Sequence, residues 1–173
     1  LIATSPEDWL RMMGNLVPGF NEADKVFARS SSSRISYHDA PAFDGGWHCF
    51  VQVKDADDVE NFGKRLLIHS LTTEYGFMRK IFRSDTGEVV GYRPWTIFDP
   101  TTFSRERLLF EGKPVVDGRG LDVFPADIQV IGGKMRQLDT SLLKVTSKNL
   151  GHISTQYGLT VSGSNESMSL INN

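Results

Sequence analysis

The feature that most constrains the fold is the strict alternation of side chains from Gly46 to Lys54. Successive residues of a β-strand point to opposite faces, so this run predicts a strand with one apolar and one mixed face. It is the clearest strand signal in the chain, so the fold is expected to contain a β-sheet. The apolar face would carry Trp47, Cys49, Val51 and Val53, and the other face His48, Phe50 and Gln52.

Helices and further strands are expected around this strand. Ser5 and Pro6 form a helix start, because a hydroxyl accepts from the first free amides and proline suits the first helical position. The turn residues 84–87 separate two strand-like runs and predict a hairpin, whose second arm contains Pro94 and must include an edge or a bend. The predicted helices cover 6–16, 59–71 and 135–145, and the predicted strands cover 25–29, 46–54, 77–83 and 88–98. Their irregular order favours α+β over a doubly wound α/β fold.

The chain has 173 residues, which corresponds to one domain. We expect this domain over residues 1–161, shortened at its amino end because the chain begins with Leu1, and a polar, flexible tail over 162–173. A single cysteine, Cys49, makes neither an intrachain disulfide nor a thiolate zinc cage, which favours a reducing compartment. No apolar run is long enough to span a bilayer. A cytoplasmic protein with no membrane partner is therefore expected.

Positive charge is concentrated in residues 62–83, which hold five basic residues and one acid, Glu74. The net charge of −2 argues against coating nucleic acid through bulk positive charge, but such a local band suits binding to a single-stranded DNA track. A solvated helix face is the alternative explanation of the same pattern. The basic residues are Lys64, Arg65, Arg79, Lys80 and Arg83.

Three groups of residues could carry chemistry. Arg29 precedes four serines, Ser30–Ser33, whose hydroxyls can donate to phosphate oxygens; a flexible linker is the alternative. His48 lies on the predicted strand after two glycines, where an imidazole can bind phosphate or serve as an acid or base, or simply be structural. Asp99 follows the hairpin and precedes a proline, a position that suits either a Mg²⁺ ligand or a turn.

The order of these groups resembles the archaeo-eukaryotic primase superfamily, especially the primase-polymerase domains of plasmids, phages and integrating elements. Residues 46–51 look like its second motif, Ile97-Phe98-Asp99 looks like its third, and residues 104–114 are similar to a segment that often follows in members from mobile elements. Walker-type phosphate loops, Rossmann glycine fingerprints, zincin helices and nucleophile elbows are missing from the sequence, which leaves the common hydrolase and dehydrogenase classes without support.

The resemblance implies a sheet like that of an RNA-recognition domain beside a small α/β unit, and template-directed nucleotidyl transfer with two Mg²⁺ or Mn²⁺ ions. It implies that His48 holds the incoming nucleoside triphosphate and that Asp99 is a metal ligand and catalytic residue. Arg29 and the serines Ser31, Ser32 and Ser33 would assist with the phosphates. Single-stranded DNA would be the template, and a helicase domain or partner would accompany the enzyme.

One motif of the superfamily has no counterpart. Its first motif, two acids separated by one residue, would precede the first helix, where only Leu1 to Thr4 stand. Asp55-Ala56-Asp57 has this spacing but follows the histidine strand, where a helix cap explains it better. Two-metal transfer needs several carboxylates, so the site is incomplete in this chain and truncation is the favoured explanation.

Two other functions stay open. A non-catalytic single-stranded DNA-binding or replication-initiation module would use the basic band, with Tyr75, Phe77 or Tyr92 as stacking platforms. A histidine-metal nuclease would use His38 and His48, but these two lack a close metal-ligand spacing and this class ranks last.

Overall fold

Local sequence signals set the first helix, α1 (Pro6–Leu16), as expected. The Ser5 hydroxyl accepts a hydrogen bond from the Asp8 amide at 3.1 Å, and Pro6 occupies the first turn. Met12, Met13 and Leu16 form its buried side. These features belong to a computed structural model, which describes residues 5–37, 46–104, 114–117, 120–157, 159–164 and 167–172.

The chain divides into two compact units, where the sequence predicts a single domain. The first unit contains residues 1–21, 54–107 and 139–173, and the second contains residues 22–53 and 108–138. Both combine short antiparallel pairings with helical segments or turns, so the protein is α+β. No helix among the described residues is long and apolar enough to cross a membrane.

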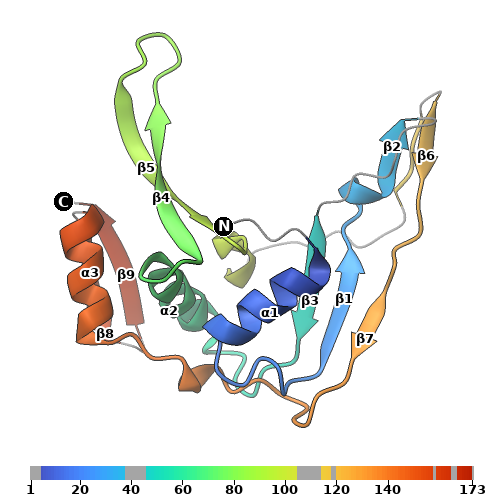
Figure 1. Ribbon diagram of the computed structural model, residues 1–173, viewed down its shortest axis with the longest axis horizontal. Helices are drawn as coiled ribbons and strands as arrows, with labels where there is room; N and C mark the ends of the chain where they lie inside the picture. The colour runs from blue at the N-terminus through green and yellow to red at the C-terminus, as the bar shows by residue number, and fades with distance from the viewer. Residues whose placement is uncertain are drawn as a thin grey trace. The chain divides into compact units, whose positions relative to one another are not determined.

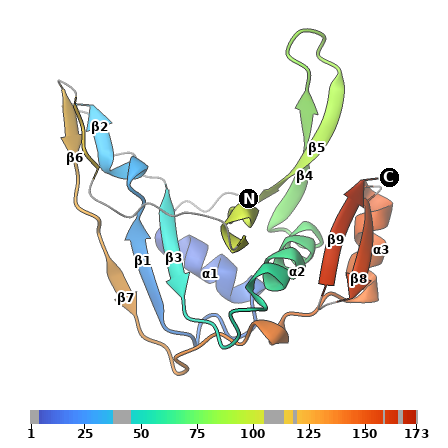
Figure 2. The ribbon, with the colours of Figure 1, turned by 180° about the vertical axis from the view of Figure 1, so that it is seen from behind.

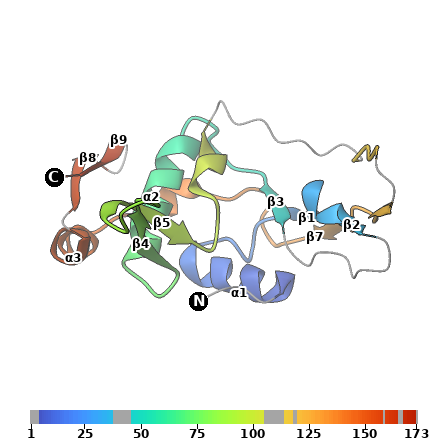
Figure 3. The same ribbon diagram turned by 90° about the horizontal axis from the view of Figure 1, so that it is seen from above.

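The first unit is built around α2 (Val59–Leu71). Ile68 and Leu71 of this helix pack with Val145 and Ile153 in a fully buried cluster, against which Met78 also packs. The unit's other elements are the hairpin β4 (Gly76–Phe82) and β5 (Val89–Thr96), the 3₁₀ turns η2 (Pro100–Phe103) and η3 (Thr140–Leu142), the helix α3 (Ser147–Tyr157) and the hairpin β8 (Leu159–Ser164) and β9 (Ser167–Asn172). The β8–β9 hairpin lies beside α3 (Figure 3).

The second unit contains a three-stranded antiparallel sheet in which β1 (Lys25–Arg29) lies between β3 (Trp47–Val51) and β7 (Gln129–Ile131) (Figure 2). Phe27 is buried and stacks on Trp47 with ring centroids 5.0 Å apart. A 3₁₀ turn, η1 (Ser32–Arg34), leads into β2 (Ile35–Tyr37), which pairs with β6 (Leu121–Val123). The strand predicted from the alternation over residues 46–54 is therefore confirmed as β3.

The last predicted helix, over residues 135–145, is wrong. This segment is extended apart from η3, and its side chains Leu138, Leu143 and Val145 are buried. The third helix of the chain is α3, which follows it. Thr146 caps the amino end of α3, because its hydroxyl accepts a hydrogen bond from the Asn149 backbone amide at 3.3 Å. Ile153 of α3 is buried, and Leu150 and Tyr157 pack beside it at helical spacing, so α3 has an apolar stripe of three residues that is short and easily overlooked in the sequence.

The polar segment 162–173 also differs from the expected flexible tail. Residues 159–164 pair in register with residues 167–172, from Leu159 opposite Asn172 to Ser164 opposite Ser167. Leu159 and Val161 in one strand, and Met168 and Leu170 in the other, alternate with polar residues, so the sequence does carry a short period-two signal for this pairing.

Candidate nucleic-acid interface

The β4–β5 hairpin places three residue pairs on one face. Cross-strand partners share a face of an antiparallel pair, as do every second residues along a strand. Phe77 lies opposite Trp95, Arg79 opposite Arg93, and Ile81 opposite Gly91. We call this surface the arginine face. The opposite face carries the pairs Met78–Pro94 and Lys80–Tyr92.

The base of the hairpin is fixed to the first unit, and its far end is not. Met78 packs against the buried cluster of α2, and the Trp9 indole Nε1 donates to the Ile97 carbonyl oxygen at 2.6 Å. Residues 79–90 are exposed throughout, and the hairpin extends away from α2 (Figure 1). A rigid base with an exposed stem is a suitable arrangement for presenting side chains to a ligand.

The arginine face combines aromatic rings with two cations. The guanidinium carbon of Arg79 lies 5.2 Å from the ring centroid of Trp95, and that of Arg93 lies 5.8 Å from the same ring. Phe77 is 45% exposed and Trp95 is 38% exposed. Two like charges directly opposite each other destabilise a strand pair, and neither strand contains an acid that would offset them. An anion between the two guanidiniums would relieve this repulsion.

The five basic residues of the predicted DNA track differ in their position, exposure and charged partners. Arg79 lies on the arginine face, whereas Lys80 lies on the opposite one. Arg83 lies 3.8 Å from Glu88 in an exposed ion pair near the hairpin's turn. On α2, Lys64 is exposed and pairs with Glu60 at 3.1 Å.

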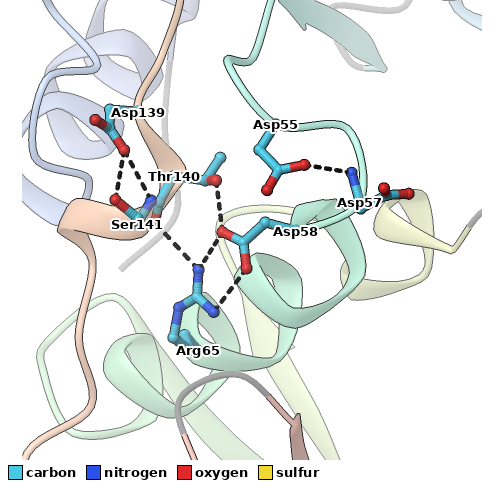
Figure 4. Close-up of polar contacts among 7 residues, drawn as sticks. All are labelled: Asp55, Asp57, Asp58, Arg65, Asp139, Thr140 and Ser141. Carbon is cyan, nitrogen blue, oxygen red and sulfur yellow. Dashed lines mark hydrogen bonds and ion pairs between the residues drawn. The ribbon is translucent and has the colours of Figure 1, made fainter.

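Arg65 is buried and belongs to the interior of the first unit. Only 2% of its side chain is exposed, and its guanidinium bonds both carboxylate oxygens of Asp58, at 2.6 and 3.0 Å. It also donates to the Thr140 carbonyl oxygen, and the Thr140 hydroxyl donates to Asp58 at 2.6 Å (Figure 4). A buried guanidinium paired in this way offers no surface to a nucleic acid.

The carboxylates around this pair serve local structure. Asp55 accepts from the Asp57 amide, and Asp139 accepts from the amide and hydroxyl of Ser141 and so begins η3 (Figure 4). The acid-x-acid pair Asp55-Ala56-Asp57 thus forms a turn before α2. Among the described residues, no three His, Cys, Asp or Glu side chains gather so that they could hold a metal ion.

Asp99 lies in the first unit, immediately after the hairpin. Its carboxylate accepts from the amide and the hydroxyl of Thr101 at 2.9 and 2.8 Å and so begins η2. Phe98 and Phe103 hold this turn through an edge contact with ring centroids 5.8 Å apart. Asp99 is exposed and is the turn former that Asp-Pro predicts; a metal role stays a prediction.

His48 and the serine segment belong to the second unit. His48 is half-buried on β3 opposite Ala28, and its ring meets the edge of Phe50 at 6.2 Å. The guanidinium of Arg29 lies 4.7 Å from the centroid of Trp47. Their roles toward a triphosphate stay predictions.

The serines after β1 form an ordered turn. Ser33 is 1% exposed, and its hydroxyl is within bonding distance of the Ser30 and Gly46 carbonyl oxygens, both at 2.9 Å. Ser31 is half-buried and Ser32 begins η1. Gly46 has a φ of 72°, and a Cβ there would lie 2.6 Å from the Ser30 hydroxyl, so glycine is required. The buried hydroxyls hold the loop rather than facing solvent.

Cys49 is not an activated nucleophile. Burial raises the pKa of its thiol to about 11, although nearby Lys25 acts in the opposite direction. A thiol with such a pKa stays protonated at neutral pH. Burial also lowers the pKa of Lys25, whose ammonium donates to the Ala23 carbonyl oxygen at 2.6 Å.

Sequence reasoning missed Arg93 and Trp95, because both lie outside the basic band. The signal that identifies them is the predicted turn at 84–87, since pairing the two arms around it brings Arg93 opposite Arg79. Tyr75, a proposed stacking residue, instead accepts a hydrogen bond from the Asn15 amide group at 3.1 Å. His38 and most of the segment 104–114 lie outside the described residues.

Comparisons with known proteins give no family for this chain. No protein-family model matches it, and neither a curated protein nor a solved structure was found to be similar to it.

Proposed function

We propose that this chain binds single-stranded nucleic acid through the arginine face, as the template-binding part of a primase-polymerase type of replication protein. The observation that carries the proposal is the opposed pair Arg79 and Arg93, both over Trp95. Trp95 offsets part of the repulsion between the two cations, and a bound anion would offset more of it.

A nucleic-acid strand supplies the two chemical groups that this face accepts. Guanidinium groups bond phosphate oxygens with two parallel N–H donors, and Trp95 and Phe77 offer ring surfaces for bases. Stacking on an aromatic side chain requires a base whose face is accessible, as in a single strand. The Gly91 position leaves the end of the face open, because a Cβ there would meet no atom within 4 Å. A sugar or base can therefore approach the backbone.

The test is binding of a labelled oligothymidine to single alanine variants, followed by fluorescence anisotropy over a range of salt concentrations. Arg79→Ala and Arg93→Ala should each weaken binding by about 1.5–3 kcal/mol, the contribution of a charged hydrogen-bonding group. Each should also reduce the slope of log affinity against log salt by about 0.7, the value for one phosphate contact on a single strand.

Lys80→Ala is the matched control, because it removes the same charge from the opposite face of the same hairpin. It should change affinity much less than either arginine variant. Equal losses in all three variants would show that only general positive charge matters, and would overturn the assignment to this face.

A second candidate is template-directed nucleotidyl transfer itself. It is supported by the chain order of the strand that bears His48 and the hairpin that leads to Asp99, and by the α+β class. Asp99 is a single carboxylate engaged by Thr101, so the described residues do not fit a two-metal centre. The proposed role of Asp99 is therefore that of one metal ligand among others.

This second candidate is tested by titrating labelled nucleoside triphosphate with and without Mn²⁺. His48→Ala should weaken binding in both conditions, because a donor to charged phosphate is lost. Asp99→Asn should weaken mainly the Mn²⁺-dependent part. Equal affinities of wild type and both variants would exclude these residues from a nucleotide site.

A further inference from the structure

The far half of the β4–β5 hairpin has a different chemistry from its base. Three large apolar side chains beyond the last pair of the arginine face are exposed, and nothing in the described chain covers them. Exposed apolar groups that cluster, rather than scatter singly, indicate a binding surface. They are Phe82 at 59%, Val89 at 40% and Val90 at 50% exposure, and we call them the apolar tip.

An irregularity in the strand pairing separates the apolar tip from the arginine face. Ile81 pairs with Gly91 but Phe82 pairs with Val89, which leaves Val90 as an extra residue on β5. Such a bulge increases the local twist and changes the direction of the side chains beyond it. The tip is therefore oriented differently from the face that carries Arg79 and Arg93.

Charge changes along the hairpin in the same direction. The strands near the base contain Arg79, Lys80 and Arg93 and no acid, whereas the turn contains Asp85 and Glu88. Glu88 also pairs with Arg83, which reduces the positive charge near the turn. A phosphate backbone is thus attracted to the base of the hairpin and not to its end. The apolar tip suits the part of a nucleic acid that carries no charge, which is the flat face of a base pair.

We propose that the apolar tip stacks on the terminal base pair of a duplex at the point where one strand leaves it and runs along the arginine face. The hairpin would then act as a wedge at a junction between single- and double-stranded DNA. This inference rests on the proposed single-strand binding and extends it to a second ligand. Apolar side chains placed against base steps are a known means of opening a duplex end, because they replace part of the lost stacking.

The experiment compares three labelled DNA ligands: a duplex with a single-stranded tail, the tail alone, and the blunt duplex. Wild type should bind the tailed duplex about fivefold or more tightly than the tail, because the tip adds contacts to the terminal pair. The fluorescence of a 2-aminopurine base in that pair should change on binding, since the reporter responds to a new contact on the face of the base. The blunt duplex should bind most weakly.

The variant Phe82→Ser/Val89→Ser removes apolar surface from the tip without changing charge. It should bind the tail as wild type does but lose the preference for the tailed duplex and the 2-aminopurine signal. Leu142→Ser is the matched control, because Leu142 is an exposed apolar residue of the same unit, at 53%, outside the hairpin. The single variant Phe82→Leu, which keeps an apolar group, should retain most of the preference and guards against a folding defect.

Three outcomes would overturn the wedge. The first is equal affinity of wild type for the tail and the tailed duplex. The second is a junction preference that persists in the double variant. The third is a concentration-dependent dimer that Phe82→Ser/Val89→Ser abolishes, because the tip would then be a contact between copies of this chain. The proposed single-strand binding is tested separately by Arg79→Ala on the tail alone, so a failed wedge leaves it intact.

Discussion

Two arginine sites of the first unit differ in almost every physical respect. Arg65 is buried, its charge is matched by the carboxylate of Asp58, and its bonds to Asp58 and Thr140 lie within the unit. Arg79 and Arg93 are exposed, oppose each other across a strand pair and lie over one indole ring. The first site joins α2 to η3, whereas the second holds two cations ready for an external anion.

The difference shows that the environment of an arginine, rather than its place in a basic stretch, decides what it does. A buried pair that loses one partner leaves an unmatched charge in the interior, so its removal is costly. An exposed arginine is screened by water and contributes little to stability. Substitutions at the two sites should therefore separate stability from binding.

The largest effect is expected at the buried site. Arg65→Ala should lower the free energy of unfolding by about 3–5 kcal/mol, because the half-buried carboxylate of Asp58 loses its partner and the buried Arg65 side chain leaves a cavity. Urea unfolding measured by circular dichroism tests this. Lys64→Ala, which breaks an exposed ion pair on the same helix, should cost less than about 0.5 kcal/mol. Similar losses in the two variants would remove the distinction between buried and exposed cations.

The next largest effect is expected on oligothymidine binding when Trp95 is removed, because Arg79 and Arg93 both lie over its ring. Trp95→Ala should weaken oligothymidine binding by about 1–3 kcal/mol, the contribution of base stacking on an aromatic side chain. Tyr92→Ala removes an aromatic ring from the opposite face and serves as the control. If Tyr92→Ala weakens binding as strongly as Trp95→Ala does, the ligand does not distinguish the two faces.

A smaller effect concerns acid stability at the buried site. Burial by itself would raise the pKa of Asp58, but hydrogen bonds from Arg65 and Thr140 and the charge of Arg65 outweigh it, so the pKa is lowered. A carboxyl with a lowered pKa contributes stability above its ordinary value of about 3.9, and this contribution is lost as the pH falls through the folded-state pKa. Urea unfolding at pH values from about 6 down to 3 should show this loss.

Asp58→Asn should be less stable than wild type near neutral pH and should depend less on pH in that acidic range. A variant whose stability falls with acid as steeply as that of wild type would assign the acid sensitivity to other carboxyls.

The smallest expected effect is an increase, rather than a decrease, in the free energy of unfolding. Arg93→Glu converts a repulsive cross-strand pair with Arg79 into an attractive one, which should raise the free energy of unfolding by about 0.2–1 kcal/mol while abolishing most oligothymidine binding. Arg83→Glu is the contrasting variant, because it places two acids together near the turn and should destabilise the hairpin. Loss of stability in Arg93→Glu would contradict the proposed cost of the arginine pair.

Most of the elements could be predicted from local sequence. α1 begins and ends at the predicted residues because Ser5, Pro6 and Leu16 carry the signals of its start and of its buried side. The strand at β3 and the hairpin around residues 84–87 follow from alternation and turn chemistry. α3 was missed because its apolar stripe, Leu150, Ile153 and Tyr157, is short, and residues 135–145 were misassigned because buried residues with near-helical spacing also occur in extended chain.

The candidate site was predictable only in part. The basic band contains the exposed Arg79, but a count of charges cannot distinguish it from the buried Arg65. The partner of Arg65, Asp58, lies seven residues earlier and also bonds Thr140 far along the chain. Arg93 and Trp95 become part of the site only through strand register. In both examples the role of the residue depends on contacts between distant parts of the chain, which the composition of a segment does not reveal.

The proline in β5 has a consequence for the protein before and during folding. Pro94 has no amide hydrogen, so at this position β5 cannot donate to an additional strand. The hairpin is two-stranded among the described residues, and its exposed aromatic and β-branched side chains would otherwise favour pairing with other chains. Pro94, together with the charges of Lys80 and Arg93, therefore opposes aggregation, and variants that neutralise these charges should be kept at low concentration so that solubility and binding stay separate.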